Sequence, residues 1–300
     1  VKKHNKPKGT RVLRIVQGTE DQMFKSYFNG FMDQYASKLG AEDPYKNAVA
    51  ELANKKHEAV EKLLTKLGKY TVKVYLNKEG KNIEVPEEMH GQFFKDETYC
   101  IDIDGEHHRY IIQWIGPDLP ADELSHILDY MAQLHDYVYS PFKITGVQVM
   151  NGHEDDTLLK FFKNGFVVHD GPHLDKAALE QSLLAKGAMF RVQGPFDETP
   201  QAIQQEDMIA QNLNSQEAFF IIKPDSNKAS YAWFGIGCSV GERGYAERLE
   251  KILNCSSCTH VEETQEPDDF WATLGGKTEY SSTKLLNFAP GFEPRMFQVS

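Results

Sequence analysis

The chain has 300 residues, 40% hydrophobic and 26% charged, a balance typical of folded proteins and a length that favours two compact domains. Its net charge of −11 argues against a nucleic-acid partner, because nonspecific binding needs a basic surface. No apolar run approaches the roughly 18 residues that span a bilayer, so we expect no membrane span. Four cysteines are too few for a disulfide scaffold, which favours a reducing cytoplasm.

The chain opens on a basic stretch, residues 1–14, which is either a solvated linker or a patch for a weak contact with phosphoinositide headgroups. A helix is predicted over residues 41–67, where a thin apolar stripe runs among Glu and Lys and Gly68 suits the C-cap. Because this stripe is weak and lies between patterned segments, we interpret the helix as a connector between domains.

Residues 93–137 form the most informative stretch. The pattern predicts a strand at 98–103, a tight turn at Asp104-Gly105, a second strand ending in YIIQWIG at Gly116, and an amphipathic helix from about residue 120 to 137. These elements together form a compact α+β unit.

The same unit recurs about 120 residues later, around YAWFG at residues 231–235. Short strands at 70–76, 189–192 and 296–299 repeat with a similar offset, as do Trp114 and Trp233, each followed within two residues by Gly and then by a helix. The sequence therefore predicts a tandem array with a period of about 115 residues.

We expect the chain to be a slice of a longer multidomain protein. Its predicted segments are the C-terminal end of a preceding repeat (1–36), a helical connector (37–67), a whole domain (68–172), a linker (173–186), a second whole domain (187–293) and the first strand of a following repeat (294–300).

Three short motifs are set aside. The glycine-rich loop at 235–241 has no counterpart in the other unit, which argues against a nucleotide site. The segment from Asp102 to Gly105 lacks the spacing of a calcium loop and fits a hairpin turn. Cys255 and Cys258 lack a second pair, so we interpret them as incidental thiols. No catalytic constellation is present, and we predict that the protein is not an enzyme.

Carboxylates flank both copies of the unit, at the start of the first strand and in the first helical turn. Two acids, a backbone carbonyl and water offer the oxygen ligands that a hard cation such as Ca²⁺ prefers. The alternative is structural, because acids favour helix N-termini and Ser239 with Glu242 matches a capping box. The candidate metal residues are Asp96, Glu97, Glu123, Gln216, Glu217 and Glu242.

Together these features resemble the gelsolin/villin repeat family over essentially the whole chain. The segments that carry the resemblance are Pro86-Glu-Glu-Met-His-Gly-Gln-Phe-Phe with Asp96-Glu-Thr-Tyr, Leu213-Asn-Ser-Gln-Glu-Ala-Phe, Glu266-Pro-Asp-Asp-Phe-Trp, Leu274-Gly-Gly-Lys and Arg295-Met-Phe. The match is nearest to the fourth and fifth repeats, and the long connector is similar to the Flightless branch.

The resemblance implies tandem domains, each a mixed sheet between one long and one short helix. It also implies calcium-regulated binding, severing or capping of actin filaments in the cytoplasm, as part of the cytoskeleton. In that family an intradomain calcium site uses a carbonyl, the acid after it and a helix-start Glu. The implied actin-binding residues, on the exposed side of the long helix, are His126, Asp129, Gln133 and Tyr137.

Two departures leave a second hypothesis open. Glu97 and Glu217 stand where the family usually has Asp, and His135 stands where an acid shared with actin is expected. Because neutral His is a poor Ca²⁺ ligand, the chain is alternatively a scaffolding module that keeps the fold but has lost actin regulation and binds other cytoskeletal proteins.

Overall fold

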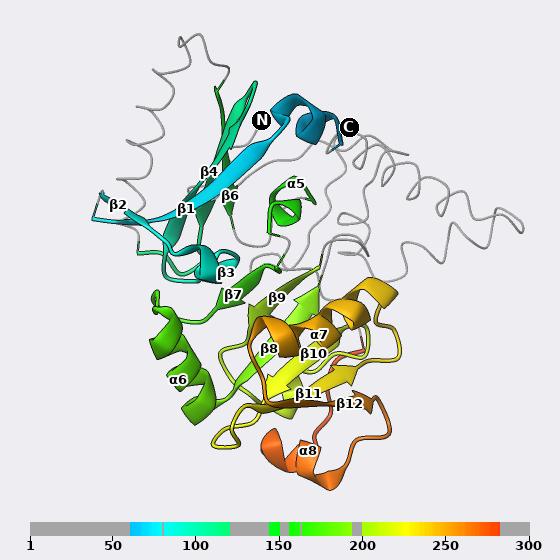
Figure 1. Ribbon diagram of the computed structural model, residues 1–300. Coiled ribbons are helices and arrows are strands. Elements are labelled where there is room, and N and C mark those ends of the chain that lie inside the picture. Colours follow the sequence, from blue (N-terminus) through cyan, green and yellow to red (C-terminus); the bar gives the residue numbers. More distant parts are fainter. Residues whose placement is uncertain are drawn as a thin grey trace, which may run out of the picture. The chain divides into compact units, whose positions relative to one another are not determined.

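The computed structural model describes residues 61–79, 81–120, 144–150, 156–162, 164–193 and 200–282. These ranges lie within one compact unit, Val49–Lys284, and they form an α+β fold with two mixed sheets and short helices (Figure 1). The expected fold class is confirmed. Within the described ranges, no helix is long and apolar enough to cross a membrane.

The first sheet has the strand order β2-β1-β4-β5-β6. Its strands are β1 (Tyr70–Lys78), β2 (Lys81–Glu84), β4 (Thr98–Gly105), β5 (Arg109–Ile115) and β6 (Ile144–Met150). All pairs are antiparallel except β5 with β6, which are parallel. The parallel pair needs a long crossover, and the segment that makes it contains the expected helix at 120–137, which lies outside the described residues.

The hairpin between β4 and β5 differs from its prediction. Asp104 is still in the ladder, paired with Arg109, so the turn falls at residues 105–108 instead of at Asp104-Gly105. The backbone N–H of Glu106 donates to the carbonyl oxygen of Leu67 at 2.8 Å. A tertiary contact with the preceding helix thus accompanies the shift of the turn.

The second sheet has the order β12-β11-β10-β8-β9-β7-β3. Its strands are β3 (Gln92–Phe94), β7 (Val167–His169), β8 (Ala188–Gln193), β9 (Gln201–Gln204), β10 (Ala218–Ile222), β11 (Ala229–Phe234) and β12 (Ser257–Glu262). The β11–β12, β7–β9 and β3–β7 pairs are parallel, and the others are antiparallel.

Four strands of each sheet share one topology. The run β1-β4-β5-β6 pairs antiparallel, antiparallel and then parallel, and the run β8-β10-β11-β12 does the same. We refer to these runs, with their adjoining loops, as the first and second repeats.

The second sheet is covered on both faces in the way that strand alternation requires. Phe220 and Ile222 of β10 belong to the same core cluster as Leu249 of the long helix α7 (Val240–Ile252). Phe219 and Ile221, which alternate with them along the strand, face the other way and join the cluster of Phe270 from the short helix α8 (Asp268–Thr273). A mixed sheet between one long and one short helix is therefore present here.

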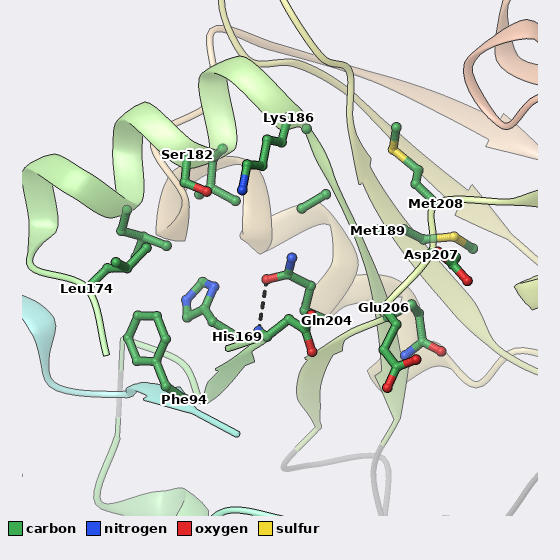
Figure 2. Close-up of a pocket in the computed structure, with 16 residues that line it drawn as sticks. Phe94, His169, Leu174, Ser182, Lys186, Met189, Gln204, Glu206, Asp207 and Met208 are labelled. Carbon is green, nitrogen blue, oxygen red and sulfur yellow. Dashed lines mark hydrogen bonds between the residues drawn. The ribbon is translucent and has the colours of Figure 1, made fainter. Parts of the chain in front are cut away.

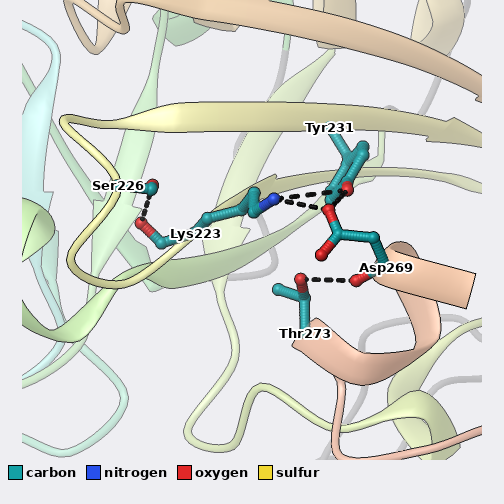
Figure 3. A network of polar contacts seen from close by, with 5 residues as sticks. All are labelled: Lys223, Ser226, Tyr231, Asp269 and Thr273. Atoms are coloured by element: carbon teal, nitrogen blue, oxygen red, sulfur yellow. Dashed lines mark hydrogen bonds and ion pairs between the residues drawn. The ribbon is translucent and has the colours of Figure 1, made fainter.

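A polar network fastens α8 to the sheet (Figure 3). One carboxylate oxygen of Asp269, Oδ2, accepts hydrogen bonds from Lys223 Nζ at 2.6 Å and from the Tyr231 hydroxyl at 2.5 Å. The Lys223 side chain holds the pKa of Asp269 below its usual value by hydrogen bonding. The network orients the short helix at the edge of the core.

The remaining helices are short and locally determined. The helix α6 (Lys176–Lys186) begins as predicted, with the Asp175 side chain accepting the Ala178 N–H at 2.8 Å, and stops at Gly187. The connector is described only at residues 61–67, where Gly68 has a φ of 67° and serves as the expected C-cap. A 3₁₀ turn (Glu87–Met89), another at Ala210–Asn212 and α5 (Asp156–Lys160) complete the described elements.

Candidate functional site

The first repeat clamps its strand-start acid with a backbone loop. The N–H of Gly116 donates to the carbonyl oxygen of Glu97 at 2.9 Å, and the N–H of Asp118 donates to that of Lys95 at 3.1 Å. A Cβ on Gly116 would lie 2.0 Å from the Lys95 oxygen. Glycine is therefore required where this loop passes the strand start.

The second repeat is built in the same way. The N–H of Gly235 donates to the carbonyl oxygen of Glu217 at 3.0 Å, and the N–H of Gly237 donates to that of Ser215 at 2.7 Å. A Cβ on Gly235 would lie 2.4 Å from the Ser215 oxygen. The recurring Trp-x-Gly motif is thus explained by close backbone approach, and it places Glu97 and Glu217 in equivalent positions.

Negative charge collects around the first clamp. Burial raises the pKa of Asp96, and repulsion from Asp118, Asp170 and Glu97 raises it further, while Lys95 opposes the shift. Lys95 itself pairs with Asp170 at 2.9 Å. Since more acids than cations converge here, the surroundings of Asp96 electrostatically favour a bound cation.

The Glu97 carboxylate is buried, with a relative exposure of 7%, and its Oε1 accepts the backbone N–H of His173 at 3.1 Å. The imidazole of the same His173 lies 3.0 Å, Nδ1 to oxygen, from the Tyr99 hydroxyl. Burial and the charge of Glu97 raise the pKa of Tyr99, so Tyr99 stays neutral. The Glu97 carboxylate thus accepts its hydrogen bond from an uncharged group, the backbone amide of His173.

The Glu217 carboxylate has a different partner. Arg191 Nε donates to Oε2 at 2.5 Å, and the Nη2 group donates to Oε1 at 2.6 Å. The Glu217 side chain is 1% exposed and that of Arg191 is 11% exposed. This is a buried, bidentate ion pair between β8 and the start of β10.

The other two residues predicted to form this second site are also engaged. Glu242 forms the capping box of α7, in which its Oε2 accepts the Ser239 N–H at 2.9 Å and its own N–H donates to Ser239 Oγ at 3.1 Å. The backbone N–H of Gln216 donates to the side chain of Asn214 at 3.0 Å. The capping box expected at Ser239 and Glu242 is thus present.

The remaining predicted site residues lie outside the described part of the chain. Within that part, no group of three or more His, Cys, Asp or Glu side chains is placed to hold a metal ion. The predicted site residues whose surroundings stay predictions are Glu123, His126, Asp129, Gln133 and Tyr137.

Comparison with known proteins indicates which family the chain resembles, which the geometry of the site alone does not. No protein-family model matches the chain. Gelsolin of Xenopus laevis is 28% identical over 100% of this chain, and advillin of Mus musculus is 27% identical over 95% of it. The cytoplasmic gelsolin of Homarus americanus is 28% identical over 72% of the chain. The chain thus resembles the gelsolin/villin superfamily over nearly its whole length.

The chain spans 74% of the Xenopus gelsolin but only 36% of the advillin and 29% of the lobster protein. A solved complex of Thorarchaeota 2DGel3 with rabbit actin covers 68% of the chain at 17% identity, with 98% of that chain matched. Its TM-score of 0.26 is too low to carry a structural argument. The position within the superfamily, as repeats four and five or as a Flightless-like branch, stays a prediction.

The sequence does not reveal Arg191 as the partner of Glu217, because the two residues are 26 positions apart and lie on different strands. A signal was present in hindsight. Arg191 is the only charged residue in the otherwise apolar and polar segment Ala188–Gln193. A single charge inside a buried strand requires a partner, and Glu217 stands at the start of the adjoining strand.

A cavity of about 360 Å³ lies between α6 and strands β7, β8 and β9 (Figure 2). His169 lines it, and burial lowers the pKa of this imidazole to about 3. Its Nε2 lies 2.6 Å from the Gln92 Oε1, whereas its buried Nδ1 has no hydrogen-bond partner among the described residues. The charged side chains that line the same cavity are one cation, Lys186, and three acids, Asp170, Glu206 and Asp207.

The pKa values of Cys255 and Cys258 agree with the interpretation of both residues as incidental thiols. Burial raises the pKa of Cys258, and it raises that of Cys255 to about 11. Both are free cysteines that are partly exposed. A nucleophilic or metal-binding thiol needs a lowered pKa, so these two lack the activation that redox chemistry requires.

Proposed function

We propose that this chain binds actin through its gelsolin-like repeats, as part of a calcium-regulated protein that severs or caps filaments. It acts by docking, with no chemical catalysis, in the cytoplasm at the actin cytoskeleton. The observation that carries the proposal is the match to gelsolin and advillin over nearly the whole chain. The repeated clamp of the strand-start acid supports it, because the same local construction occurs twice.

Calcium belongs to this proposal through the first repeat. Asp96 and Glu97 would supply oxygen ligands beside the helix-start Glu123, and the ion would contribute charge neutralisation between them. The raised pKa of Asp96 supports this set, since burial and then repulsion from neighbouring acids disfavour its charged form. We further propose residues 68–172 and 187–293 as the two whole repeats, within the six segments predicted above.

The decisive experiment is cosedimentation of the chain with actin filaments, in calcium and in chelator. We expect binding that is stronger in calcium. Replacing Gln133 or Tyr137 by alanine should weaken binding about tenfold, because interface anchors commonly carry that much. Lys81→Ala is the matched control, as Lys81 is exposed on β2 and is not part of the expected helix. Absence of cosedimentation in both conditions would refute the proposal.

The second candidate is a scaffolding module that keeps the fold without actin regulation. The observation that favours it is the Arg191–Glu217 ion pair, which engages one of the predicted calcium acids. His135, at a position where an acid is expected, also favours the scaffolding module. Calorimetry that detects no calcium binding at millimolar concentration, together with no cosedimentation, would select this candidate.

The basic stretch at 1–14 is proposed to give a weak contact with phosphoinositides. Vesicles that contain a phosphoinositide should retain the chain at low salt, and a variant with its lysines in this stretch changed to glutamine should be released. Equal retention of both would refute this contact.

A further inference from the structure

We propose that Arg191 is the resident cation of the second repeat. Its guanidinium holds Glu217 where the resemblance implies Ca²⁺, so that this repeat keeps its carboxylate arrangement without a metal ion. The proposal concerns side chains of this chain alone and does not depend on actin binding.

The ion pair provides a hydrogen-bond donor for each oxygen of the Glu217 carboxylate. Each of its two oxygens accepts an N–H from the same guanidinium, at 2.5 and 2.6 Å. Such fork-to-fork pairing fixes the carboxylate plane as well as neutralising its charge. The guanidinium is permanently charged, so the neutralisation persists at every physiological pH.

The neighbouring oxygens are committed as well. The Glu217 carbonyl accepts the Gly235 N–H, the Ser215 carbonyl accepts the Gly237 N–H, and Glu242 Oε2 accepts the Ser239 N–H. Calcium requires six to eight oxygens at about 2.3–2.6 Å. A calcium ion at this place would therefore have to displace the Arg191 guanidinium from the Glu217 carboxylate.

The first repeat shows that the arginine is specific to the second. In the strand ladders, Arg191 pairs with Phe219, and the residue that pairs correspondingly with Tyr99 is Leu76. Leu76 is 5% exposed and carries no charge. The equivalent carboxylate of Glu97 faces the amide of His173, a neutral donor. One position thus separates a strand-start carboxylate that is paired with an arginine from one that faces a neutral donor.

Calcium titration calorimetry on the full chain tests the proposal. The titrations use a Glu97→Gln background, which removes the first-repeat carboxylate. In this background Arg191→Leu introduces the residue that the first repeat has. We expect calcium to bind Arg191→Leu at least about tenfold more tightly than the background, and to raise its thermal midpoint by several degrees, because a ligand that binds only the folded state stabilises it. The background itself should show neither effect.

Arg191→Lys is the matched control, since it keeps the charge and should gain no calcium affinity. A folded Arg191→Leu variant without such a gain would overturn the proposal. If Arg191→Leu does not fold, Glu217→Gln in the same background decides. An unchanged calcium heat supports the proposal, and a lost heat overturns it. Since no titration contains actin, failure here is distinguishable from failure of the actin proposal.

Discussion

The two repeats present the same backbone around chemically different carboxylates. Glu97 and Glu217 are both buried at a strand start, and a Trp-x-Gly loop clamps both through the carbonyl oxygen of the acid itself. Glu97 accepts a neutral backbone N–H, whereas Glu217 accepts two charged N–H groups from Arg191. The clamp therefore reproduces the position of the acid, and a side chain on the adjoining strand sets its charge balance.

This difference separates two roles that one structural position can have. Burying a carboxylate is costly unless a cation or several donors compensate it. In the second repeat Arg191 supplies that compensation permanently and ties β8 to β10. In the first repeat burial raises the pKa of Asp96, the acidic neighbours Asp118 and Asp170 raise it further, and Lys95 opposes them. The Glu217 carboxylate is thus compensated by a cation of its own repeat, whereas the Glu97 carboxylate accepts a neutral donor.

The largest expected effect comes from breaking the internal ion pair. Arg191→Leu should lower the free energy of unfolding by about 3–5 kcal/mol, because it leaves Glu217 buried without its charge partner. Urea unfolding monitored by tryptophan fluorescence measures this change.

The matched control is Arg109→Leu in the first repeat, where Arg109 also makes a bidentate pair, with Asp102. The Arg109 side chain is 44% exposed and that of Asp102 is 11% exposed, so solvent partly screens this pair and its loss should cost less than the loss of the Arg191 pair. Equal losses at Arg191 and Arg109 would contradict the distinction between a buried and an exposed pair.

The next effect tests the part that the repeats share. Gly116→Ala and Gly235→Ala should each destabilise the protein by about 1–3 kcal/mol, since each new Cβ would contact a backbone oxygen. Similar losses are expected, because the two clamps have the same hydrogen bonds. Gly244→Ala is the control, as a Cβ there meets nothing within 4 Å. A large loss at only one of the two clamps would show that they are not equivalent.

Local features of this architecture could be predicted from sequence, and features that depend on distant segments could not. The capping box at Ser239, the N-cap at Asp175 and the C-cap at Gly68 are determined by residues within one helical turn. The β4–β5 turn was predicted two residues too early because the Glu106 N–H bonds to Leu67, which belongs to another element.

In the candidate site, too, the sequence predicts some features and does not predict others. The positions of Glu97 and Glu217 followed from the repeat, because a duplicated pattern predicts a duplicated backbone. The partner of Glu217 did not follow, since strand pairing brings Arg191 to it across a whole strand and loop. The predicted actin-binding helix at 120–137 lies outside the described residues, so its face stays a prediction.

The smallest expected effect is a loss of stability at low pH, and it arises at a histidine on a strand beside the first clamp. His169 on β7 is fully buried, and burial lowers its pKa to about 3 from an ordinary value of 6.5. Between these values the unfolded chain binds a proton that the folded chain does not, so stability falls as pH falls below 6.5. One such group contributes a slope of about 1.4 kcal/mol per pH unit.

His169→Gln should remove that slope, because the amide keeps a donor for Gln92 but does not titrate. Urea midpoints measured from pH 7 to pH 5 should therefore decline less steeply in His169→Gln than in the unaltered chain. The control is His107→Gln, on the exposed hairpin turn of the same repeat. Parallel pH profiles for His169→Gln and the unaltered chain would contradict a neutral, buried His169.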